Sequence, residues 1–213
     1  MYVPKHFEVT DIGLMHELIR DYPLATLITL GKDGINANHI PFYLAQNPQP
    51  YGLLQGHVAR SNNLLQNIND DLDYLAIFHG SNTYITPNWY ATKEETGKVV
   101  PTWNYAVVHV YGRLSIIDEP SWLYNQLSTL TDHNEARFSK PWSISDAPQD
   151  FTEKLMASIV GIEMTITKLI GKWKVSQNQQ ERNQESVIAG LTSDNQLGAF
   201  HMADLVRNSP KKL

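Results

Sequence analysis

The chain has 213 residues, a formal net charge of −5 and no cysteine. Its length allows one domain or two small ones, and the missing cysteine excludes disulfides, thiolate nucleophiles and cysteine-based zinc sites. The acidic balance argues against an obvious nucleic-acid footprint, and the sequence has neither a run of about 20 apolar residues nor a signal-peptide core, so a cytoplasmic location is expected.

The amino-terminal part of the chain predicts a helix followed by a β-hairpin. Thr10-Asp11 caps apolar residues at helical spacing, and Tyr22-Pro23 ends the helix because the residue before proline disfavours helical geometry. Residues 24–30 read as a buried strand, and the Asp-Gly signal within 31–34 predicts a tight turn. The returning strand, 35–44, contains Pro41, which predicts an edge position or a bulge.

The rest of the chain alternates strands, helices and polar connectors. We expect a polar turn over 46–50, strands over 51–58, 74–78, 105–117 and 162–174, and an irregular stretch over 133–148. Helices are expected from 61–62 through 68, from 119 to 130, over 150–159, and weakly near 185–191 and 197–206. Several strands with hairpin signals predict an antiparallel barrel decorated with helices.

Aromatic, amide and hydroxyl side chains are concentrated between Tyr84 and Arg113. This stretch holds two of the five tryptophans and includes Thr102-Trp103-Asn104. Polar side-chain tips need partners when they are buried, and together with aromatic rings they suit the wall of a pocket for a flat polar ligand. A β-hairpin whose aromatics cover a sheet explains the same composition, so the residues alone leave both interpretations open.

Two other segments are suited to binding an anion. Arg60-Ser61-Asn62 follows a predicted strand and opens a predicted helix, which favours either a phosphate cradle or an ordinary helix cap beside a surface arginine. Lys172-Trp173-Lys174 ends the last predicted strand. It is suited either to a stacking face with an anion site or to a solvated strand end with Trp173 packed inward.

The sequence offers few candidates for catalysis. Four of the eight histidines, His39, His57, His79 and His109, lie on predicted strands, where a histidine is able to bind a metal or haem. Because none has paired spacing such as HExxH, no metal site is predicted. No acid/base pair, nucleophile motif, nucleotide-binding glycine motif or helix-turn-helix is recognised, so the catalytic residues stay unknown.

The order of several segments resembles the PaiB family, described as FMN-binding negative transcriptional regulators. The resemblance covers residues 1–190 and is carried by 1–7, 56–62, 84–90, 97–105, 109–113 and 171–178. Departures from the family pattern are small: Asn63-Leu64 stands where Pro-Gln is expected, and Asn88 where serine is common.

The resemblance implies a mainly β fold with peripheral helices, the antiparallel, Greek-key-like split β-barrel of FMN-binding proteins related to pyridoxamine-phosphate oxidases. It further implies a homodimer with FMN at the subunit interface. The FMN phosphate is expected at Arg60–Asn62. The flavin ring and ribityl chain are expected beside His39-Ile40 and Gln55-Gly56-His57, and the mouth of the pocket is expected near Lys172. The implied cofactor-binding residues are His39, Ile40, Gln55, Gly56, His57, Arg60, Ser61, Asn62, Thr102, Trp103, Asn104, Lys172 and Trp173.

These expectations give one leading hypothesis and two alternatives. The leading one is a cytoplasmic FMN-binding flavoprotein that represses transcription, built from a barrel domain over 1–190 and a helical tail over 191–213. DNA is a partner that neither charge nor motif supports, and no membrane partner is expected. The alternatives are a flavin-dependent oxidoreductase for a small molecule, in which bound flavin carries the redox chemistry, and a haem-binding or haem-degrading split-barrel protein.

Overall fold

A computed structural model of the chain describes residues 1–31, 34–45, 50–66, 68–69, 72–194 and 198–209. The chain divides into two compact units. Unit 1 comprises Met1–Leu18, His79–Val108 and Ile170–Leu213, and unit 2 comprises Ile19–Phe78 and His109–Leu169. The expected division of the sequence after residue 190 stays a prediction.

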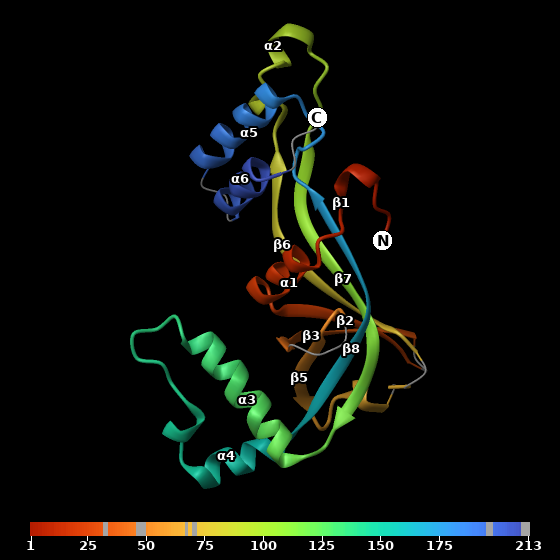
Figure 1. Cartoon of the computed structure of the whole chain (residues 1–213), viewed down its shortest axis with the longest axis vertical. Coiled ribbons are helices and arrows are strands. Elements are labelled where there is room, and N and C mark those ends of the chain that lie inside the picture. The colour runs from red at the N-terminus through yellow and green to blue at the C-terminus, as the bar shows by residue number, and fades with distance from the viewer. Residues whose placement is uncertain (32–33, 46–49, 67, 70–71, 195–197, 210–213) are drawn as a thin grey trace. The chain divides into compact units, whose positions relative to one another are not determined.

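Eight strands and six α-helices make up the described chain (Figure 1). The strands are β1 Glu8–Val9, β2 Leu24–Gly31, β3 Gly34–Pro41, β4 Tyr43–Ala45, β5 Leu53–Ala59, β6 Tyr74–Ile85, β7 Thr102–Ile117 and β8 Ile159–Lys174. The helices are α1 Ile12–Asp21, α2 Lys93–Thr96, α3 Pro120–Glu135, α4 Gln149–Met156, α5 Glu181–Ser193 and α6 Ala199–Arg207. Short 3₁₀ helices span Lys5–Phe7, Asn63–Gln66, Pro87–Trp89 and Ile144–Asp146.

The strands form a sheet in the order β3-β2-β6-β7-β8-β5-β4, and β1 pairs with β8. All pairs with an assigned register are antiparallel; β2 and β3, for example, pair from Leu24 opposite Pro41 to Gly31 opposite Gly34. Because β3 is the edge of this order, the edge position predicted from Pro41 is confirmed. The predicted class, mainly β with peripheral helices, is confirmed as well.

Helix α1 begins where the sequence predicts. The Asp11 carboxylate accepts a hydrogen bond from the Leu14 amide (3.3 Å), which satisfies one of the free N–H groups of the first turn. Met15, Leu18 and Ile19 are buried, as their helical spacing indicates. The helix stops two residues before Pro23.

The core of unit 1 explains the first half of the aromatic stretch. Tyr90 is buried in a cluster with residues of α5 and α6, and Trp89 and Trp173 pack against that cluster. Trp89 lies so close to α5 that a Cβ placed on Gly190 would be 2.4 Å from its ring. Trp89 and Tyr90 are therefore core residues of unit 1, and Trp173 packs inward.

Two expected elements differ from the structure. The helix expected from 61–62 through 68 is wrong, because only the 3₁₀ helix Asn63–Gln66 forms. The Asn62 side chain accepts the Leu64 amide (2.9 Å), a local turn bond that competes with helix geometry. The strand expected over 35–44 is interrupted at Phe42, whose amide donates to Pro23 O (3.0 Å) instead of joining the ladder.

Other boundaries moved by smaller amounts. Strand β6 runs to Ile85 instead of residue 78, and α3 extends into the stretch expected to be irregular. The predictions that concern residues 32–33, 46–49, 67 and 197 lie outside the described residues. Within the described chain, no helix combines the length and the apolar character needed to cross a membrane.

Candidate functional site

The turn after β5 is joined to the edge strand β3. Asn62 Nδ2 donates to Asn38 Oδ1 (3.0 Å), and the next residue on β3, His39, is hydrogen-bonded through Nδ1 to Thr26 Oγ1 (3.2 Å). His39 and Ser61 are exposed. The structure therefore links two of the predicted segments, the turn and the His39 end of β3, through one amide pair.

The predicted residues of β5 face in two directions. Gly56 belongs to the interior, since a Cβ there would lie 3.0 Å from the Phe42 ring and 3.3 Å from Ile40, which is itself buried. Gln55 and His57 are half-buried on the opposite face, as the alternation of a strand requires. Gln55-Gly56-His57 therefore does not form one ligand-facing surface, and Ile40 and Gly56 pack against each other.

A polar network covers the Gln55 and His57 face. Glu163 Oε1 on β8 accepts hydrogen bonds from Gln55 Nε2 (2.8 Å) and from Trp122 Nε1 of α3 (3.2 Å). His57 Nδ1 donates to Gln126 Oε1 of α3 (3.0 Å). Gln126 is 3% exposed, and its Nε2 has no partner among the described residues. Sequence reasoning missed Glu163, Trp122 and Gln126, because only a register assignment brings them beside β5.

Arg60 is engaged by protein groups. Its Nε donates to Ala157 O (2.9 Å), and its terminal nitrogens form a bidentate pair with Asp118 (2.8 and 2.5 Å). This hydrogen bonding raises the pKa of Arg60 and lowers the pKa of Asp118. Arg60 and Asp118 also line a hollow of about 220 Å³ together with Glu119 and Glu153, so the hollow itself is unsuited to a phosphate.

The predicted residues of β7 and β8 in unit 1 lie together. Lys174 Nζ donates to Trp103 O (2.6 Å) and to Thr102 Oγ1. Lys172 Nζ donates to Tyr2 O (3.2 Å) and lies 5.3 Å from the centre of the Tyr105 ring. The sequence pattern named both lysines in the candidate anion segment Lys172-Trp173-Lys174, whereas the resemblance implied only Lys172 as a cofactor-binding residue, although the two occupy the same face of β8 by strand alternation.

Asn104 is the most buried of the predicted residues in unit 1. Its side chain is fully buried, Nδ2 donates to Ser176 Oγ (2.9 Å), and Oδ1 has no partner among the described residues. Ser176 has φ 64°, a left-handed backbone that residues other than glycine rarely adopt. The Trp103 side chain, in contrast, is 54% exposed and stacks edge-on with Tyr84 (centroids 6.1 Å apart).

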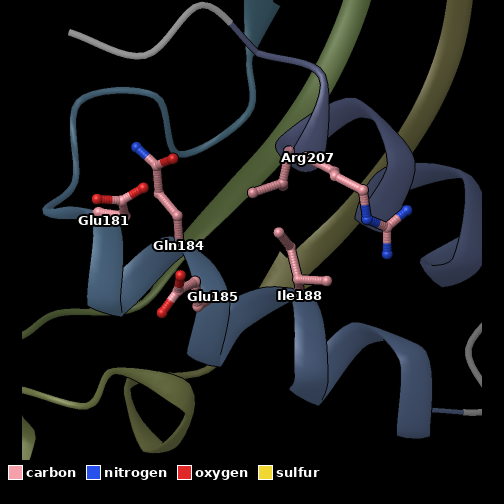
Figure 2. A pocket seen from close by; sticks show the side chains of 6 residues that line it. Glu181, Gln184, Glu185, Ile188 and Arg207 are labelled. Carbon is pink, nitrogen blue, oxygen red and sulfur yellow. The ribbon is translucent and has the colours of Figure 1, made fainter. Parts of the chain in front are cut away.

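A separate hollow of about 320 Å³ lies between α5 and α6 and contains none of the predicted residues. Figure 2 shows Glu181, Gln184, Glu185 and Ile188 projecting from α5 and Arg207 from α6. Arg207 is paired with Asp204. In the described part of the chain, no group of three or more His, Asp or Glu residues is placed to hold a metal ion.

The predicted residues thus fall into two sets that are described separately. In unit 2 their contacts include the Asn62–Asn38 link, the network around Gln55 and His57, and the Arg60–Asp118 pair. In unit 1, Thr102, Trp103 and Asn104 lie beside the lysines of β8 and Ser176.

Comparison with known proteins identifies relatives along the whole chain. A protein of Emericella nidulans of uncharacterised function is 33% identical, over 97% of this chain and 96% of its own. Bacillus subtilis "Protease synthase and sporulation protein PAI 2" is 27% identical, over 100% of this chain and 99% of its own. The second relative confirms the resemblance to the PaiB family found in the sequence.

A solved structure shares the fold. A conserved hypothetical protein from Mycobacterium tuberculosis superposes with a TM-score of 0.59 at 12% identity, over 85% of this chain and 95% of that one. This likeness concerns the fold alone, and the predicted split β-barrel is confirmed. The family model described as "Putative FMN-binding domain" matches residues 1–168, and the chain belongs to that family.

Proposed function

We propose that the chain is an FMN-binding, PaiB-like protein that acts as a negative regulator of transcription. The observation that carries the proposal is the family match, because residues 1–168 include all the predicted cofactor-binding residues of unit 2 and Thr102–Asn104. Lys172 and Trp173 lie beyond the matched residues. A cytoplasmic location and a homodimer belong to the same proposal.

The side chains of unit 2 fit the chemistry of FMN. A flavin presents carbonyl and ring-nitrogen acceptors, ribityl hydroxyls and a phosphate, so its site needs N–H donors on a concave polar surface. Gln55 and Asn62 supply amides, and the buried Gln126 Nε2 is a donor that still needs an acceptor. When bound, the flavin supplies any redox chemistry, while these residues orient it.

Arg60 keeps capacity for a phosphate. A guanidinium has five N–H donors, and the bonds to Ala157 and Asp118 use three of them. The Arg60 side chain is 44% exposed, so its remaining donors are accessible to a ligand. The carboxylates of the neighbouring hollow require that a phosphate approach from the side of Ser61 and Asn62.

A second candidate, a flavin-dependent oxidoreductase for a small molecule, is favoured by the charge of the α5–α6 pair. This pair carries more acidic than basic side chains: Glu181, Glu185 and Asp204 against Arg182 and Arg207. Such a surface repels the phosphates of DNA. This acidic surface is consistent with repression that involves no direct DNA recognition, and it is equally consistent with a purely enzymatic role. A gel-shift assay that shows sequence-dependent retardation at modest salt would restore direct recognition.

The test compares FMN with riboflavin, which lacks the phosphate. Arg60→Ala should weaken FMN binding by roughly tenfold or more while leaving riboflavin nearly unchanged, since a charge-assisted bond is lost. Asp118→Asn removes the carboxylate partner but keeps the arginine, and it should bind FMN at least as tightly as the unmodified chain. Flavin fluorescence quenching measures each of these affinities.

Arg182→Ala is the matched control. Arg182 forms an equally bidentate pair with Glu95 (2.6 and 2.7 Å) at similar exposure, so its loss removes the same charge elsewhere. FMN affinity should not change in this variant. Equal weakening of FMN and riboflavin by Arg60→Ala would exclude Arg60 as a phosphate ligand, and a Soret band in the purified protein would favour the haem alternative.

A further inference from the structure

Two ammonium groups on one face of β8, those of Lys172 and Lys174, have no acidic partner among the residues that the structure describes. None of the four ion pairs in the described part of the chain involves Lys172 or Lys174. Glu8 stands opposite Lys172 in the β1–β8 register but is exposed and forms no ion pair with it. Lys172 is only 9% exposed, so water solvates its charge poorly.

The donors of these lysines are only partly used. Each ammonium has three N–H groups. Lys174 gives two of them to Thr102 and Trp103, and Lys172 gives one to Tyr2 O. One N–H of Lys174 and two of Lys172 therefore remain without a hydrogen-bond partner among the described residues. Burial, and secondarily the charge of Lys172, lowers the pKa of Lys174, so Lys174 lies in an environment that disfavours its own charge.

We propose that Lys172 and Lys174 form a binding site for a small oxyanion, the phosphate or carboxylate group of a small molecule. An oxyanion accepts the three remaining N–H groups and neutralises the two like charges. Strain at Ser176, two residues beyond Lys174, is the kind of backbone cost that clusters at ligand sites.

This site is tested independently of FMN binding, because inorganic phosphate alone serves as the probe ligand. Calorimetric titration of inorganic phosphate into the flavin-free full chain at low ionic strength should give saturable binding with a dissociation constant of roughly 1 mM. Lys172→Met and Lys174→Met should each weaken it by about tenfold or more. Lys174→Arg, which keeps the charge, should retain it.

Lys168→Met is the matched control, since Lys168 lies on the same strand and is exposed over Tyr111. It should leave phosphate binding unchanged. Circular dichroism establishes that each variant is folded, and a glutamine substitution at the same position replaces any methionine variant that is not. The proposal is overturned if the unmodified chain shows no saturable phosphate binding, or if Lys172→Met and Lys174→Met bind phosphate as tightly as the unmodified chain.

Titrations of the same variants with FMN and riboflavin identify the source of the oxyanion. Loss of FMN affinity in Lys174→Met with unchanged riboflavin affinity assigns the oxyanion to the flavin phosphate. Unchanged affinity for both flavins, with phosphate binding lost, assigns it to a different small molecule. A chain that binds phosphate through these lysines but takes up no FMN contradicts the proposed function while leaving this site in place.

Discussion

Ser176 and Asn104 depend on each other. The fully buried Asn104 amide donates to the Ser176 hydroxyl, and Ser176 holds a left-handed φ of 64° to present it. A non-glycine residue in this conformation costs about 1 kcal/mol or more, whereas an unsatisfied buried amide costs about 1–3 kcal/mol. The hydrogen bond therefore outweighs the strain.

Substitutions of Ser176 separate these two energies. Ser176→Ala removes the hydroxyl and keeps the strain, while Ser176→Gly removes the hydroxyl and relieves the strain. Both should lower the free energy of unfolding, the alanine variant by about 1 kcal/mol more than the glycine variant. Urea denaturation of the two variants measures the difference, and a glycine variant no more stable than the alanine variant would contradict the assignment.

The Arg60–Asp118 pair gives a pH-dependent observable. Hydrogen bonding to Arg60, and secondarily its charge, lowers the pKa of Asp118 below 3.8. Because the folded pKa is depressed, the stabilisation is present above the pKa of the unfolded chain and is lost as pH falls through the folded pKa. An NMR titration of the Asp118 carboxyl should show this low pKa, and Arg60→Ala should restore the ordinary value. An unshifted pKa in the unmodified chain would rule out the pair in solution.

At the scale of elements, helix α5 packs closely against Trp89 of the aromatic stretch because Gly190 has no side chain. Alanine normally stabilises a helix by about 1 kcal/mol relative to glycine. Here a Cβ would lie 2.4 Å from the Trp89 ring, and overpacking typically costs about 1–3 kcal/mol. Steric conflict should therefore outweigh helix propensity.

Gly190→Ala should accordingly destabilise the chain by about 1 kcal/mol in chemical denaturation. Trp89→Leu provides the control background, since the smaller side chain makes room for the added methyl. In that background Gly190→Ala should be neutral or stabilising, a reversal of sign that propensity alone does not produce. A stabilising effect in the unmodified chain would contradict the packing described for α5.

Elements set by local chemistry were predictable from sequence. The Asp11 cap, Pro23 and Pro41 gave the start of α1, its end and the edge position of β3. The α-helix expected after Ser61 does not form, because the Asn62 side chain accepts the Leu64 amide hydrogen bond in a local turn. That bond depends on a rotamer that residue order does not specify.

The candidate site was predictable only in part for a similar reason. Alternation on β8 puts Lys172 and Lys174 on one face, but the role of Lys174 depends on its contact with β7. Glu163 and Gln126 meet β5 residues more than 60 positions away, through hydrogen bonds spanning 108 and 69 positions. Contacts of that separation follow from strand register and helix packing, which the sequence pattern leaves open.

At the scale of the whole molecule, the predicted cofactor residues belong to two compact units. Unit 2 carries amide donors and Arg60, and unit 1 carries an exposed tryptophan and two lysines that form no ion pair with any described residue. Both sets consist of groups suited to an anionic, planar ligand. FMN binding is therefore the property of the chain to measure first.

The most direct measurement is titration of the flavin-free full chain with FMN, followed by gel filtration and a visible spectrum of the protein peak. We expect saturable quenching of flavin fluorescence and flavin absorption bands that elute with the protein. A colourless protein peak together with unquenched FMN throughout the titration would contradict this expectation.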